Sequence, residues 1–128
     1  MTKPVDHRPG RRQQLGRLGE HLAVRYLQEH GYEIRTTNYR CAVGEIDIVA
    51  RDGECLVFVE VRTRQCPEFG LPEESVDHRK LHKLVDLAET YLQQHEEDAG
   101  PCRIDVVAIS LSPSGELRRL EHIQNVIS

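Results

Sequence analysis

Gly44-Glu45-Ile46-Asp47-Ile48-Val49 and Val57-Phe58-Val59-Glu60-Val61-Arg62 are the two stretches that decide the fold. Both are rich in β-branched residues, which favour strands. An Asp-Gly pair lies between them and is typical of a tight hairpin turn. The stretches therefore predict adjacent antiparallel strands joined by the loop Asp52-Gly53, which would pair Arg51 with Glu54. The second strand is almost continuously apolar, as expected of a central strand covered on both faces.

Elements on either side of the hairpin complete one domain. Apolar residues recur at helical spacing before it, from Leu15 to Leu27, and after it, from Leu81 to Leu92. Strands are predicted over residues 32–39, 43–51, 55–63, 103–111 and 116–122. The order α-β-β-β-α-β-β predicts a single α/β domain, residues 14–128, with a mixed central sheet flanked by helices. Residues 1–13 hold prolines, a glycine and basic side chains, and we expect a flexible basic arm there.

Two glycines, Gly16 and Gly19, fall inside the first predicted helix. Each costs helix stability, roughly 1 kcal/mol relative to alanine. Their presence predicts that the helix backbone packs close against the sheet.

Composition limits the class of protein. The chain has 128 residues with 17 Lys+Arg and 21 Asp+Glu, a formal net charge of −4, which argues against a protein that coats nucleic acid. No apolar run is long enough for a membrane span, and no secretory signal is evident, so we expect a cytoplasmic protein. The 4 cysteines contain no Cys-x-x-Cys pair, which predicts free, mostly buried thiols: Cys41, Cys55, Cys66 and Cys102.

Acidic residues gather on the predicted hairpin. With the expected loop, Glu45 lies directly opposite Glu60, and Asp47 is the diagonal neighbour of Glu60. Side chains alternate along a strand, so Arg62 projects to the same side as these acids. Neighbouring carboxylates repel, and a divalent cation such as Mg²⁺ would remove that repulsion. Carboxylates and a fixed cation around a metal suit phosphodiester hydrolysis. The pattern fits equally a solvated strand end without metal, where Glu45 and Glu60 pair with Arg62 and Arg64.

These residues resemble the bacterial YraN family of endonuclease-like proteins. The two hairpin stretches carry the resemblance, together with Gly19-Glu20, Asn38, Arg40 and Arg103-Ile104-Asp105-Val106-Val107. The family is itself similar to the PD-(D/E)xK nuclease superfamily, notably the archaeal Holliday-junction resolvases. The resemblance spans residues 16–111 and implies the restriction-endonuclease-like αβββαβ core.

The resemblance also implies site residues and an activity. Asp47 and Glu60 would bind Mg²⁺, with Mn²⁺ as a substitute, and Glu20 of the first helix would complete the site. Arg62 stands where the superfamily usually has lysine; it can hold a phosphate but stays charged, which leaves turnover open. The implied activity is a DNA endonuclease acting on branched or damaged DNA, as a homodimer if it works like a resolvase, and without an organic cofactor.

Other interpretations remain open. The same fold would also serve a catalytically weak or inactive module that binds DNA structures. A protein-interaction adaptor with an acidic face is a third interpretation, and a solvated helix acid is an alternative role for Glu20. Asp105 is expected to be structural, pairing with Arg103 or Arg40. The candidates for contact with DNA phosphates are Arg40, Arg64, Lys80 and Lys83.

Overall fold

The chain adopts the element order that its hydrophobic pattern predicts. The computed structural model describes residues 11–65 and 78–127. Its elements are α1 (Arg11–Glu29), β1 (Glu33–Cys41), β2 (Gly44–Asp52), β3 (Cys55–Gln65), α2 (His78–Gln94), the short 3₁₀ helix η1 (Glu96–Asp98), β4 (Cys102–Leu111) and β5 (Leu117–Ile123). The α/β class is confirmed, and the arrangement is consistent with a restriction-endonuclease-like core.

The five strands form one sheet in the order β1-β2-β3-β4-β5. β3 and β4 are parallel, whereas the other neighbours are antiparallel. Parallel neighbours need a crossover connection, and α2 lies between β3 and β4 in the chain. β3 is the middle strand, and Leu56, Val57, Phe58 and Val59 are all 0% exposed. The prediction of a central strand covered on both faces is therefore confirmed.

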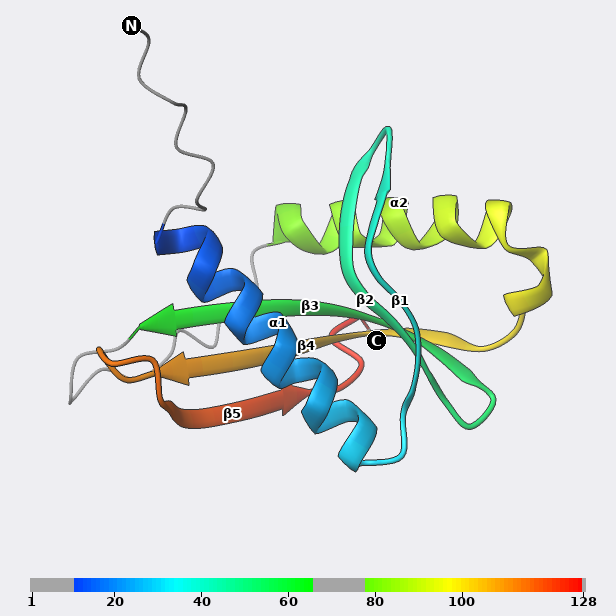
Figure 1. Cartoon of the computed structure of the whole chain (residues 1–128). Helices are drawn as coiled ribbons and strands as arrows, with labels where there is room; N and C mark the ends of the chain where they lie inside the picture. The colour runs from blue at the N-terminus through cyan, green and yellow to red at the C-terminus, as the bar shows by residue number, and fades with distance from the viewer. Residues whose placement is uncertain (1–10, 66–77, 128) are drawn as a thin grey trace, which may run out of the picture.

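Each helix covers one face of the sheet. Ala23 and Leu27 of α1 pack in one core with Val57 and Val59, whereas the opposite face of β3 packs against α2. Figure 1 shows α1 crossing the sheet, while the end of β1 and the start of β2 bend away from the other strands and cross α2, which β2 contacts. The bend separates the start of β2 from β3 and opens the sheet between them.

The first helix starts earlier than expected. It begins at Arg11, so residues 11–13, predicted as part of the arm, are helical, in keeping with the high helix propensity of arginine and glutamine. Residues 1–10, the rest of the predicted arm, lie outside the described residues.

The two helix glycines behave differently. A Cβ at Gly19 would lie 2.8 Å from Thr63 Cβ, so the backbone of α1 does pack closely against β3 there. A Cβ at Gly16 would meet nothing within 4 Å, so the close-packing prediction is wrong for that residue. Gly19 sets the height of α1 above the sheet.

The predicted hairpin register is wrong by two residues. Asp52 pairs with Cys55, so the loop is Gly53-Glu54 and not Asp52-Gly53. Gly53 has φ +60°, which suits the first central position of a type II′ turn, where glycine is preferred. Since the shift is an even number of residues, the residues of β2 that pair with β3, from Ile48 to Asp52, keep the faces that the sequence predicts.

Two expectations drawn from composition can be checked. Cys41, Cys55 and Cys102 are free, as predicted, but the first two are half-buried and Cys102 is exposed, so the expectation of burial is wrong for them. Cys66 lies outside the described residues. Neither described helix combines the length and apolar character that a membrane crossing requires.

Candidate metal centre

The sheet opens at Asp47. Ile48 and Val59 form the last pair of the β2–β3 ladder on this side. Beyond them, the Val61 backbone N–H donates to Asp47 Oδ2 at 2.8 Å, so a side chain replaces the next strand contact. Asn38, opposite Asp47 in β1, has φ +54°, a conformation that asparagine tolerates better than most residues. Both strands are therefore distorted at the level of this aspartate.

The distortion turns β2 from one core to the other. Ile48 packs in the core under α1, whereas Ile46 packs in the core beside α2, although alternate residues of a regular strand share a face. Asp47 lies between them, at the point where the strand rotates. This position lets its carboxylate meet side chains from α1.

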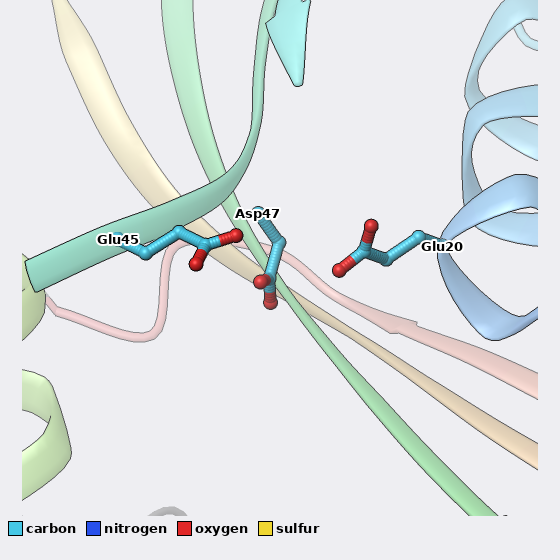
Figure 2. Close-up of side chains that lie close together, drawn as sticks. All are labelled: Glu20, Glu45 and Asp47. Atoms are coloured by element: carbon cyan, nitrogen blue, oxygen red, sulfur yellow. The ribbon is translucent and has the colours of Figure 1, made fainter. Parts of the chain in front are cut away.

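Three carboxylates meet at this opening. Oxygens of Glu20, Glu45 and Asp47 all lie within 4.8 Å of one another. Figure 2 shows Glu20 approaching from α1 and Glu45 from the bent part of β2, with Asp47 between them. The close packing at Gly19 brings Glu20 down to the sheet, where its half-buried side chain lies beside the other two acids.

The electrostatic environment of Asp47 is unfavourable to its charge. Burial, together with the charges of Glu20, Glu60 and Glu45, raises the pKa of its carboxyl from 3.8 to about 6, against the hydrogen bond from Val61. None of the groups with the largest effect on this pKa is a cation. Burial also raises the pKa of Glu20, while a hydrogen bond with the Asn38 side chain opposes that shift. Negative charge is therefore concentrated here, and the neighbouring side-chain charges that act most on Asp47 are all negative.

Glu60 and Arg62 lie beside this trio. Arg62 Nε is 3.7 Å from Glu60 Oε2, and their side chains are 21% and 19% exposed. Among the residues that the structure describes, Glu60 Oε2 is buried and has no hydrogen-bond partner. Glu60 is outside the group of three, yet its charge acts on Asp47. Its unsatisfied oxygen is suited to accept a further ligand.

The metal-free alternative describes only part of this arrangement. Glu60 does pair with Arg62, as that alternative requires. Glu45 pairs instead with Arg40, at 3.4 Å, and the Arg40 side chain is 79% exposed. A solvated cation of this kind offsets little of the repulsion. Asp47, which is half-buried, is not a member of either pair.

A groove of about 510 Å³ leads to the acids and is lined by Gln13, Gly16, Arg17, Glu20, Asn38, Arg40 and Glu45. The sequence pattern assigned Glu45 to the acidic cluster but not to the metal ligands, and it did not identify Arg17. Arg17 precedes Glu20 by three residues, the spacing at which helix side chains are neighbours, and that spacing was an available signal.

The predicted DNA contacts are not all at this groove. Arg40 lines it. Lys83 lies close to the start of β2, since a Cβ at Gly44 would be 3.0 Å from Lys83 Cε. Arg64 is exposed near the end of β3, and Lys80 is exposed near the start of α2.

The two acids that are fully buried among the described residues have cationic partners. Asp105 is 0% exposed and accepts hydrogen bonds from Arg103 Nε at 3.1 Å and from the Asn125 backbone N–H at 2.9 Å; His122 Nε2 lies 2.8 Å away. The structural role expected for Asp105, with Arg103 as its partner, is confirmed. Asp98 is likewise held, by Arg35, Arg51 and the Tyr91 hydroxyl.

The acids at the opening fit a hard divalent cation. Carboxylate oxygens are the ligands that Mg²⁺ prefers, and a site that uses few protein carboxylates suits an ion that keeps part of its water shell. Asp47, Glu20 and Glu45 would hold it, with the unsatisfied oxygen of Glu60 at the margin. Bound metal would also lower the repulsion that raises the pKa of Asp47.

Sequence comparisons place the chain among known proteins. The family model described as "Uncharacterised protein family UPF0102" matches residues 19–109. The chain is 45% identical over 114 residues to a UPF0102 protein of Pelotomaculum thermopropionicum, covering 89% of this chain and 95% of that one. It is 49% identical over 116 residues to a UPF0102 protein of Dehalococcoides mccartyi, covering 91% and 94%. The matched region contains the helix acid, the hairpin acids and the whole sheet up to β4, and the chain therefore belongs to the UPF0102 family, also called the YraN family.

Proposed function

We propose that this protein is a Mg²⁺-dependent endonuclease that hydrolyses phosphodiester bonds in DNA. The observation that carries the proposal is the convergence of Glu20, Glu45 and Asp47 within 4.8 Å at an opening of the sheet. A fold does not need three mutually repelling carboxylates there, whereas the buried acids Asp98 and Asp105 have cationic partners. Like-charged acids beside a groove are typical of a metal-dependent site.

Each side chain has a role in this proposal. Glu20, Glu45 and Asp47 hold the cation, with Glu60 as a further ligand at its margin. A bound divalent cation makes water more acidic and neutralises negative charge on the reacting phosphate. The Arg62 guanidinium, next to Glu60, contacts the phosphate oxygens and stabilises the charge that develops on them. Arg40 and Arg17 line the groove, where they would position the DNA backbone.

The substrate class follows from the resemblance to junction resolvases. Branched or damaged DNA, cut in the cytoplasm by a homodimer, is the corresponding proposal. The acidic composition of the chain agrees with local contact with DNA and not with extensive coating.

The direct test is Asp47→Ala assayed on a labelled four-way junction and on linear duplex with Mg²⁺ or Mn²⁺. We expect loss of at least about a thousandfold in cleavage rate, because the buried ligand is removed. Glu54→Ala, which removes an exposed carboxylate from the same hairpin, is the matched control and should cut like the parent. Cleavage by Asp47→Ala at the parental rate would overturn the proposal.

A second candidate function is DNA-structure binding without turnover. It is favoured by Arg62, which is held beside Glu60 and cannot release a proton as lysine can. Junction binding measured in Ca²⁺, without cleavage in Mg²⁺ or Mn²⁺, would support this candidate. Restoration of cleavage by Arg62→Lys would then identify the substitution that removed activity.

A further inference from the structure

A polar row crosses the sheet on the face that Glu60 and Arg62 share. Arg64 pairs with Ser110, and Ser110 pairs with Arg119. Residues paired across neighbouring strands project to the same face, so these three side chains form one line over β3, β4 and β5. The row lies further along β3 than the acids, on the same side as Glu60.

Ser110, in the middle of the row, is not explained by the fold. It is 3% exposed, and in the described part of the chain its Oγ has no hydrogen-bond partner. Its neighbours in β4, Ile109 and Leu111, are buried apolar residues. A buried hydroxyl without a partner costs free energy, so native proteins seldom keep one without a reason. A ligand that accepts a hydrogen bond from Ser110 would supply that reason.

The flanking side chains indicate the chemistry of this ligand. Neighbouring Cβ atoms across a sheet are about 5 Å apart, so Arg64 and Arg119 flank Ser110 on the two neighbouring strands. Both arginines are exposed. Arg119 Nη2 lies 3.6 Å from Glu121 Oε2, so an acid of the same strand sits beside this guanidinium. Guanidinium groups and a hydroxyl donor together match the oxygens of a phosphate.

We propose that Arg64, Ser110 and Arg119 form a second phosphate-binding subsite, which holds a backbone phosphate of the DNA away from the cleavage site. This inference rests on the proposed function. A strand rises about 3.3 Å per residue, so Arg64 lies about 13 Å along β3 from Glu60. Duplex DNA has a phosphate about every 3.4 Å of axis on each strand. For a duplex whose axis follows β3, this distance corresponds to roughly four nucleotides between the phosphate at the row and the one at the acids.

The test is fluorescence anisotropy of a fluorescein-labelled duplex in Ca²⁺ over a series of KCl concentrations. Removing one phosphate contact lowers the slope of log affinity against log salt by about 1. We expect this change, with a several-fold loss of affinity, in Arg119→Gln. The matched control is Arg118→Gln, which removes the same charge from the adjacent residue. Arg118 pairs with no residue of β4, so this variant should keep the parental slope. Equal slopes for the two variants would overturn the proposal.

Ser110→Ala separates a ligand contact from a structural role. Because the hydroxyl has no partner in the described residues, its loss should leave the melting temperature of the free protein unchanged or higher, while DNA affinity falls about tenfold. A lower melting temperature would show that the hydroxyl has a structural partner and would overturn the assignment.

Methylphosphonate linkages distinguish DNA from a free anion. A neutral linkage about four nucleotides from the cut should weaken binding by the parent protein and not by Arg119→Gln. Suppose that no neutral linkage weakens DNA binding by the parent more than by Arg119→Gln, while inorganic phosphate still binds the parent. The row then binds a free anion, and the assignment to DNA is wrong. Failure of the parent to bind any duplex or junction would contradict the proposed function itself. Normal Mg²⁺-dependent cleavage with equal behaviour of Arg119→Gln and Arg118→Gln would contradict the subsite alone.

Discussion

Asp47 and Asp105 are the same residue type on two strands of one sheet, yet their surroundings are opposite. Burial opposes ionisation of Asp105, but His122, the Asn125 backbone N–H and Arg103 outweigh it and lower the pKa. Burial of Asp47 is reinforced by Glu20, Glu60 and Glu45, and the pKa rises to about 6. Burial alone therefore does not separate a structural acid from a functional one; the sign of the neighbouring charge does.

The largest effect on stability is expected for Asp105, the structural acid of the two. Asp105→Ala leaves Arg103 inside the fold without its main partner, and breaking a buried pair in this way typically costs about 3–5 kcal/mol. Urea denaturation followed by circular dichroism measures the free energy of unfolding. A loss below about 1 kcal/mol would show that the network around Asp105 does not stabilise the fold.

In the metal-free protein, Asp47→Asn should raise the free energy of unfolding, whereas Asp105→Ala lowers it. The pKa of Asp47 in the folded protein, about 6, exceeds the ordinary value of 3.8. Between these two pH values the folded protein binds more protons than the unfolded chain, so its stability falls as the pH rises through this range. The amide removes this penalty, up to about 3 kcal/mol above pH 6, where one pKa unit corresponds to about 1.4 kcal/mol. Urea denaturation at pH 4.5 and pH 7.5, with Glu54→Gln as the control, should show a clearly larger stabilisation at the higher pH. A destabilised variant at pH 7.5 would contradict the electrostatic account.

The two helix glycines test how α1 delivers Glu20 to the acids. Gly19→Ala forces Thr63 to move and should cost about 1–3 kcal/mol, while weakening Mg²⁺ or Mn²⁺ binding measured by calorimetry. Gly16→Ala has open space around the new methyl group and should gain up to about 1 kcal/mol from helix propensity. Equal stability of the two variants would mean that the approach at Gly19 does not matter.

The smallest expected effect is a change in the pKa of Asp47 when one neighbouring charge is removed. Glu20→Gln and Glu45→Gln each remove one negative neighbour and should both lower the pKa of Asp47, with the larger change for Glu20→Gln because its charge acts more strongly. A ¹³C NMR titration of the Asp47 carboxyl measures the change. The reverse order would place Glu45, and not Glu20, as the nearer electrostatic partner.

The local pattern of apolar residues predicted the helices and strands because this pattern largely determines where they form. The apolar run at Val57–Val59 identified the central strand, and the periodicity from Leu15 to Leu27 identified α1. The hairpin register was not predicted, since Asp52-Gly53 and Gly53-Glu54 both offer a glycine to a tight turn and only the strand pairing distinguishes them. The two-residue error did not change the faces of the paired residues from Ile48 to Asp52, but the acids lie before this ladder, where the strand rotates.

The composition of the acidic group depended on tertiary geometry. Glu20 was placed in the site through the resemblance, since helix position alone leaves its direction open. Glu45 was assigned to the acidic cluster but not to the metal, because a regular strand does not reveal the rotation between Ile46 and Ile48 that brings Glu45 close to Asp47. The difference between Gly16 and Gly19 likewise depends on where Thr63 lies.

The bond from the Val61 amide to Asp47 has a practical consequence. A backbone amide that donates to a titrating carboxylate, and not to a carbonyl of the next strand, experiences the charge state of that carboxylate. Its ¹H–¹⁵N resonance should shift as Asp47 ionises, and its solvent-exchange rate should fall when a cation fixes the carboxylate. The Val61 amide resonance thus reports whether a cation occupies the metal centre, and the measurement needs no nucleic acid.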